Sequence, residues 1–105
     1  MTAPTGPVIL FDDDLYMYVL ANAAHAEAYW EEPGEYTRGF DARARPLRMT
    51  CEPHRVTLEL TGVAPDEAAL RRLVADHHRR FLPLEAPPRA AGLAEFVASL
   101  PLDAG

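Results

Sequence analysis

The sequence has one cysteine, one serine, no lysine and no long apolar run, and each shortage excludes a class of structure or chemistry. With Cys51 alone, neither an intramolecular disulfide nor a zinc site built on cysteine pairs can form. Ser99 lies outside any Gly-x-Ser-x-Gly motif, which argues against a serine hydrolase. No stretch approaches the roughly 20 apolar residues of a membrane span, and the N-terminal residues do not resemble a signal peptide. We therefore expect a cytoplasmic protein.

Negative charge is concentrated in the first third of the chain. Residues 1–35 hold seven acids and no arginine, whereas residues 36–105 hold nine acids and ten arginines. The formal net charge of −6 is therefore the sum of −7 and +1. Such a field repels nucleic acids and membrane surfaces and attracts a basic partner, although acidic residues also keep small proteins soluble. We expect neither nucleic acid nor membrane as a partner.

Three short runs with a period of two predict β-strands with one buried face. They span residues 36–40, 47–51 and 56–60, and turn-forming residues separate them. Short connections of this kind favour an antiparallel meander. Cys51 falls on the apolar face of the second run, so the pattern predicts a small buried side chain there.

Helical periodicity appears in three further segments. Asn22 is placed to cap a helix over residues 23–32, with small residues and Trp30 on the face toward the sheet. Pro65 is expected at the first position of a second helix that ends before Pro83. The core-facing stripe of that second helix consists of Leu70, Leu73, Val74, His77 and Phe81. A short third helix is expected between residues 93 and 100.

The predicted fold class is α+β: an antiparallel sheet of three to five strands packed against two main helices plus a short C-terminal helix. At 105 residues the chain is expected to form a single domain, 1–105. Flexible ends are expected at 1–7 and 101–105, with a Pro-rich linker at 83–89 before the terminal helix. Residues 8–19 are compatible with one kinked strand or with two strands joined by an acidic turn.

The run from Val8 through Asp12, Asp13 and Asp14 resembles the nucleophile motif of haloacid-dehalogenase-like phosphatases. That resemblance implies Asp12 as nucleophile and Asp14 as acid. However, Leu15 and Tyr16 follow where that family has small residues, and the chain has no lysine to neutralise a phosphoryl group. An acidic turn, or acids that protect an edge strand, is the favoured interpretation, and a phosphatase-like enzyme is a distant alternative.

The histidines and the acidic triplet do not predict a metal site. His77 and His78 are adjacent and point about 100° apart on a helix, so they cannot both face one ion. His77 lies on the apolar stripe, where a hydrogen-bonded core histidine is the commoner finding. The acidic triplet lacks the spaced oxygen ligands of an EF-hand loop. We expect no catalytic residues, no metal and no cofactor.

A protein-binding surface is the remaining prediction, because the acidic first third also carries aromatic residues, as protein interfaces do. Whether Tyr29 and Trp30 belong to this surface or to the core stays open. The predicted partner-binding residues are Asp12, Asp13, Asp14, Tyr16, Tyr18, Glu27, Glu31, Glu32 and Glu35.

Two segments, residues 15–32 and 34–49, resemble small actinobacterial proteins of the immunity type, which are encoded beside polymorphic toxins and neutralise them by binding. The resemblance covers about residues 8–80 and lies in the order of elements: a strand, an Ala-rich helix ending in an aromatic residue, then a Phe-Asp-Ala turn and a hairpin. Ala44 stands where such turns often carry glycine. The resemblance implies a protein partner, a toxin domain that is expected to be basic, and no chemistry of the protein's own. The alternative is a small homo-oligomeric regulatory or accessory protein, in which an edge strand pairs with its own copy in a homodimer.

Overall fold

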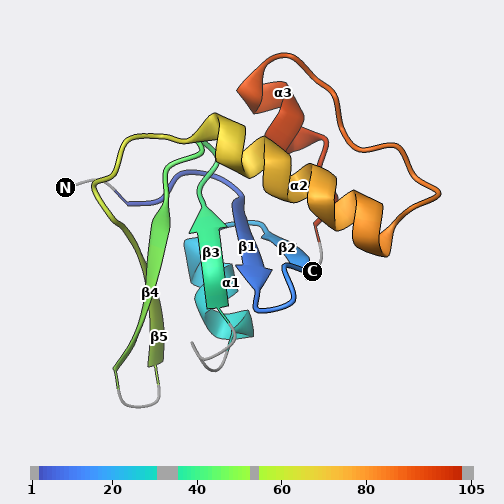
Figure 1. The fold of residues 1–105 in the computed structure, drawn as a ribbon. Coiled ribbons are helices and arrows are strands. Elements are labelled where there is room, and N and C mark those ends of the chain that lie inside the picture. The colour runs from blue at the N-terminus through green and yellow to red at the C-terminus, as the bar shows by residue number, and fades with distance from the viewer. Residues whose placement is uncertain (1–2, 31–35, 53–54, 103–105) are drawn as a thin grey trace.

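The computed structural model describes residues 3–30, 36–52 and 55–102 and confirms an α+β fold, in which antiparallel strands combine with helices (Figure 1). The elements in chain order are β1 (Val8–Asp12), β2 (Met17–Leu20), α1 (Ala23–Tyr29), β3 (Tyr36–Phe40), β4 (Leu47–Glu52), β5 (Arg55–Leu60), α2 (Glu67–Phe81) and α3 (Leu93–Ala98).

Strand β1 is the centre of a three-stranded antiparallel sheet with the order β2-β1-β3. Ile9 lies opposite Val19 on one side and Phe40 on the other. All five residues of β1 are buried, which explains why this run shows no polar alternation. Residues 8–19 therefore form two strands joined by an acidic turn, one of the two arrangements that the sequence left open.

The predicted meander of three consecutive strands is wrong. Strand β3 pairs with β1, whereas β4 and β5 form a separate two-stranded sheet in which Leu47 lies opposite Leu60. Between β3 and β4 the ladder is reduced to a single bridge, Phe40 to Pro46. Proline has no N–H to extend a ladder, and the buried apolar strand β1 needs a partner on each side.

Alternate residues of β1 face two different cores. Ile9 and Phe11 pack with α2 and α3, while Val8 and Leu10 pack with α1 and the β4–β5 hairpin. Figure 1 shows α2 and α3 on the side of the sheet away from α1. The sheet is thus a middle layer, and both of its faces are covered.

Cys51 is exposed, so the prediction that it is buried is wrong. Helix α1 contacts β5, where Val56 and Leu58 are buried, whereas Cys51 on β4 is exposed. The Glu27 side chain fixes α1 in this position, because its Oε2 accepts the backbone N–H of Leu58 at 2.7 Å. Period-two alternation identified the apolar face of β4 but not how far the helix covers it.

The cap and buried face predicted for α1 are confirmed. The Asn22 side chain accepts the N–H of His25 at 2.8 Å, and Ala26 is fully buried. Trp30 directly follows the helix and is a core residue, whereas Tyr29 is 49% exposed. The last predicted residues of this helix, 31 and 32, lie outside the described part of the chain.

Helix α2 begins at Glu67, two residues later than the proline pattern predicted. Asp66 is the cap and accepts the N–H of Ala69 at 3.0 Å, so Pro65 precedes the cap and is not the first helical residue. The predicted stripe is buried through His77, whereas Phe81 is 37% exposed. Arg71 joins this helix to the third, because its guanidinium lies 4.4 Å from the centre of the Phe96 ring.

Asp41 organises the turn after β3. Its carboxylate is completely buried and accepts N–H groups of Thr5, Arg43 and Arg45, each at 3.0 Å. The Arg45 guanidinium adds two hydrogen bonds, from Nε at 2.9 Å and from Nη2 at 2.7 Å. Thr5, in the end expected to be flexible, is therefore tied to this turn. Ala44 has a φ of 59°, the left-handed conformation for which glycine is favoured.

The hydrogen bonds to Asp41 make the fold sensitive to acid. Burial alone would raise the pKa of the Asp41 carboxyl, but hydrogen bonds from Arg45 and from the backbone N–H groups of Thr5, Arg45 and Arg43 outweigh it, so the pKa lies below its ordinary value. A lowered pKa means that the carboxylate contributes its full stabilisation above the unfolded-state pKa of about 3.9 and loses it as the pH falls through the native-state pKa.

We expect Asp41→Asn to lower the free energy of unfolding at pH 7 by about 3 kcal/mol, because it leaves the buried Arg45 interaction without its carboxylate. Urea denaturation at pH 7 and at pH 3 measures this, and the difference from the natural protein should shrink at the lower pH. The control is Glu59→Gln in the exposed pair with Arg48, which should have little effect. Equal losses of stability from the two substitutions at pH 7 would contradict the stabilising role given to the Asp41 carboxylate.

Candidate functional site

The acidic turn between β1 and β2 is built around the Asp12 carboxylate. Its Oδ1 accepts the N–H groups of Asp14 at 2.9 Å and Tyr16 at 3.0 Å, and its Oδ2 accepts the Tyr18 hydroxyl at 3.0 Å. The Leu15 N–H donates to the Asp12 carbonyl at 2.9 Å, and Leu15 has a φ of 63°. Asp12 is buried as a result and fixes the path of the turn. Because β1 is the central strand, these acids do not protect a sheet edge.

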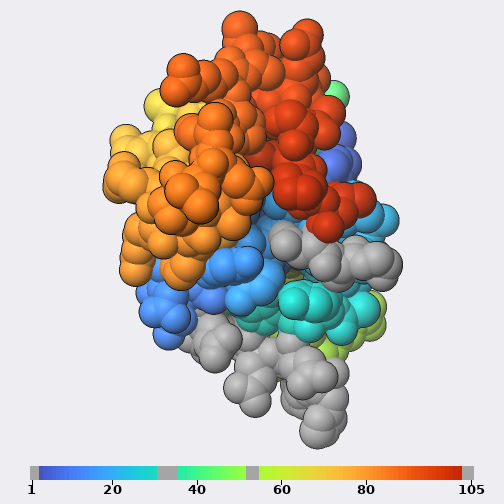
Figure 2. All heavy atoms as spheres, turned by 90° about the vertical axis from the view of Figure 1, so that its right-hand side faces the viewer, coloured from blue at the N-terminus to red at the C-terminus, as the bar shows by residue number. Residues whose placement is uncertain are grey.

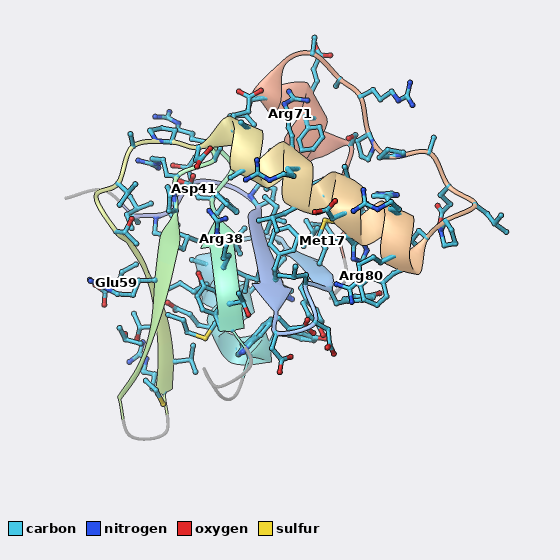
Figure 3. All side chains as sticks on the ribbon, in the orientation of Figure 1. Met17, Arg38, Asp41, Glu59, Arg71 and Arg80 are labelled. Carbon is cyan, nitrogen blue, oxygen red and sulfur yellow. The ribbon has the colours of Figure 1, made fainter. Side chains whose placement is uncertain are left out.

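Asp13 and Asp14 are exposed at the tip of this turn. One carboxylate oxygen from each of Asp12, Asp13 and Asp14 lies within 4.8 Å of the others, the only such cluster of potential metal ligands among the described residues. Arg80 joins the tip to the last turn of α2, because its Nη1 donates to the Asp14 carbonyl at 3.0 Å. Figure 3 shows Arg80 at the end of α2 that lies nearest this turn.

The two tyrosines predicted to bind a partner, Tyr16 and Tyr18, are half-buried and make aromatic contacts within the protein. The Tyr16 ring lies 4.6 Å from His77 and 5.0 Å from Phe81, measured between ring centres. Tyr18 lies 5.1 Å from Trp30 and is half-buried. This aromatic contact joins the start of β2 to α2 on one side and to the end of α1 on the other.

Two of the predicted partner-binding acids have exposed side chains in the part of the chain that the structure describes. Glu27 is committed to the Leu58 N–H, as described above. Glu31, Glu32 and Glu35 lie outside the described residues. Of the predicted partner-binding acids that the structure describes, Asp13 and Asp14 are therefore the two with exposed side chains.

A pocket of about 590 Å³ lies beside the turn, between the end of α2 and the residues that follow α3. Tyr16 and Met17 line it from the β1–β2 side, His77 and His78 from α2, and Glu85 and Ser99 from the C-terminal region. Figure 2 shows the face on which these parts of the chain meet: the end of α2 with its following loop in orange, the α3 region in red and the start of the chain in blue.

The two adjacent histidines have different environments. His77 is buried and its Nδ1 accepts the Met17 N–H at 3.0 Å, so it is the hydrogen-bonded core histidine that the apolar stripe predicted. In the neutral ring the proton is therefore on Nε2. His78 is 8% exposed, and both of its ring nitrogens lack a hydrogen-bond partner, which holds for no other buried side-chain nitrogen or oxygen of the described residues.

The sequence prediction missed His78 because the stripe was read through Leu70, Leu73, Val74 and His77. A second row, Leu70 and Val74 followed by His78, has the i, i+4 spacing of one helix face. That row could have identified a buried position, but not the absence of hydrogen-bond partners.

Comparisons with known proteins do not assign a family, because no family model, no curated protein and no solved structure matches this chain. Among the described residues, no helix has the length and apolar character needed to cross a membrane.

Asp12 and Asp13 provide a matched test of the turn. We expect Asp12→Ala to lower the free energy of unfolding by about 2 to 3 kcal/mol, because it leaves two backbone N–H groups and the Tyr18 hydroxyl without their acceptor. Asp13→Ala removes an exposed carboxylate and should leave stability close to that of the natural protein. Urea denaturation at pH 7 compares the two variants, and a similar loss for both would show that Asp12 does not organise the turn.

Proposed function

We propose that this protein is a non-catalytic binding module that recognises a basic protein surface through the tip of its β1–β2 turn. The observation that carries this proposal is the pair of exposed carboxylates, Asp13 and Asp14, on a turn fixed by buried hydrogen bonds.

The turn is ordered before any partner binds, which favours recognition. The Asp12 carboxylate holds the backbone on the near side, and Arg80 holds the Asp14 carbonyl from α2. A loop that is already ordered loses less conformational entropy on binding, so more of the contact energy is available for affinity. The negative net charge adds attraction of a basic partner at long range.

Phe81 supplies an apolar contact beside the acids. Its ring is 37% exposed, packs against Tyr16 and has the Arg80 guanidinium 5.3 Å from its centre. Aromatic residues flanked by charge are frequent contributors to binding energy at protein interfaces. Asp13, Asp14 and Phe81 together form what we call the acidic tip.

The resemblance to immunity-type proteins implies that this binding inhibits a toxin by covering part of its surface. The homo-oligomeric alternative requires self-association and not a basic partner. The phosphatase-like alternative requires Asp12 as a nucleophile, although both of its carboxylate oxygens accept hydrogen bonds within the turn.

The test is affinity capture from the native host with the tagged protein, followed by identification of stoichiometric partners. We expect one basic partner that is lost with the double variant Asp13→Asn/Asp14→Asn and is released as salt rises, because interactions between exposed charges are screened. The matched control, Glu59→Gln/Glu95→Gln, removes the same charge from exposed sites on β5 and α3 and should retain the partner.

Recovery of the protein's own copies alone would instead support the homo-oligomeric alternative. Equal loss of the partner with both double variants would mean that overall charge, and not the acidic tip, determines binding. For the inhibitor form of the proposal, the captured partner must also lose its toxic activity when the protein is added in equimolar amount.

A further inference from the structure

The C-terminal part of α2 holds the β1–β2 turn in place. His77 accepts the Met17 N–H at Nδ1, and its ring centre lies 4.6 Å from that of Tyr16. Arg80 donates to the Asp14 carbonyl at 3.0 Å. Figure 3 shows Met17 beside α2 and Arg80 at the end of the same helix. The acidic tip is therefore attached to α2 as well as to its own strands.

The hydrogen bond to His77 satisfies an N–H at the edge of the sheet. Strand β2 is an outer strand, because the order of the sheet is β2-β1-β3. In an antiparallel pair, successive residues point their N–H groups alternately toward the partner strand and away from it. The Tyr16 carbonyl accepts the Asp12 N–H at 3.2 Å, so the N–H of the next residue, Met17, points away from β1. Met17 is buried, and His77 supplies the acceptor that a further strand would otherwise supply.

This acceptor exists only while the His77 ring is neutral. A neutral imidazole has one acceptor nitrogen, whereas both nitrogens of an imidazolium carry a hydrogen. Protonation of Nδ1 would set one N–H against another and leave the buried Met17 N–H without its partner, which is unfavourable. Uptake of a proton by His77 is therefore coupled to opening of its contact with Met17.

We propose that His77 is a proton-sensitive latch, which holds the acidic turn on α2 while the ring is neutral and releases Met17 when the ring is protonated. A histidine exposed to water has a pKa of about 6.5, so at pH 5.5 it has about ten protonated rings for each neutral one. The open state gains this proton, and the closed state cannot hold it. The stabilisation by the latch is thus complete above about pH 6.5 and decreases as the pH falls, and opening at Met17 becomes about tenfold more populated between pH 7.5 and pH 5.5.

The groups around His77 include one other histidine. Tyr16 faces His77 from the turn, Arg80 lies further along α2, and Glu85 lines the same pocket from the loop after α2. Tyrosine, arginine and glutamate side chains ordinarily titrate outside the range from pH 5.5 to 7.5. His78 is buried in the same pocket wall, but neither of its ring nitrogens has a hydrogen-bond partner, so its protonation removes no acceptor from the turn.

A partner bound to the acidic tip in its closed state opposes this opening. Binding and protonation then favour different states of the turn, so each weakens the other. The latch would make recognition of the basic partner weaker in an acidic environment. This consequence rests on the proposed binding function, whereas the latch itself depends only on contacts within the chain.

The test is amide hydrogen exchange of the ¹⁵N-labelled protein, measured by NMR at pH 7.5 and pH 5.5. The rates are expressed as protection factors, which correct for the pH dependence of exchange in an unfolded chain. We expect the Met17 protection factor to fall about tenfold. The reference is the Leu58 amide, another backbone N–H accepted by a side chain, the Glu27 carboxylate at 2.7 Å. Its protection factor should change less than about twofold, because carboxylates ordinarily titrate below this range.

Two variants separate the two adjacent histidines. His77→Gln has no titratable ring at the latch, so the protection of Met17 in this variant should be independent of pH between 7.5 and 5.5. The matched control is His78→Phe, which removes the neighbouring buried histidine and leaves the latch in place. It should retain the decrease of about tenfold at Met17.

Unchanged protection of Met17 in the natural protein would overturn the proposal, and so would an equal decrease at Leu58, which would indicate loosening of the whole fold. This comparison requires no variant to fold. A decrease that persists in His77→Gln would also overturn it, because another group would then be responsible. The binding function can fail separately, since its test is capture of the partner by Asp13→Asn/Asp14→Asn and these measurements use the protein alone.

Discussion

The fold depends on one strand that is buried on both faces and paired on both edges. Strand β1 contributes Ile9 and Phe11 to the core beneath α2 and Val8 and Leu10 to the core beneath α1. Because β1 joins the two cores, its partners β2 and β3 are fixed relative to both layers of helices.

Two buried aspartates then determine where the chain leaves this sheet. Asp12 at the end of β1 and Asp41 after β3 each accept backbone N–H groups from the residues that follow them. Each carboxylate therefore replaces hydrogen bonds that a ladder would otherwise provide, and each turn contains a residue with positive φ, Leu15 or Ala44. The exposed acids Asp13 and Asp14 owe their fixed position to the buried one.

The local features of this fold could be predicted from sequence, whereas the long-range ones could not. The positions of the strands, the Asn22 cap and the α2 stripe as far as His77 all depend on neighbours within a few residues, and the structure confirms them. The pairing of β3 with β1 depends on competition between distant strands, and the meander was inferred from short connections alone. The prediction that Cys51 is buried was wrong for the same reason, because its exposure depends on how the hairpin packs against the helix α1.

The unpaired His78 is the residue that local rules explain least. Leaving a buried polar group without a hydrogen bond costs about 1 to 3 kcal/mol, in a protein class whose total stability is about 5 to 15 kcal/mol. Leucine or phenylalanine at this position would continue the row of Leu70 and Val74 and remove that cost. The neighbouring His77, with its hydrogen bond from Met17, has a structural explanation that His78 lacks.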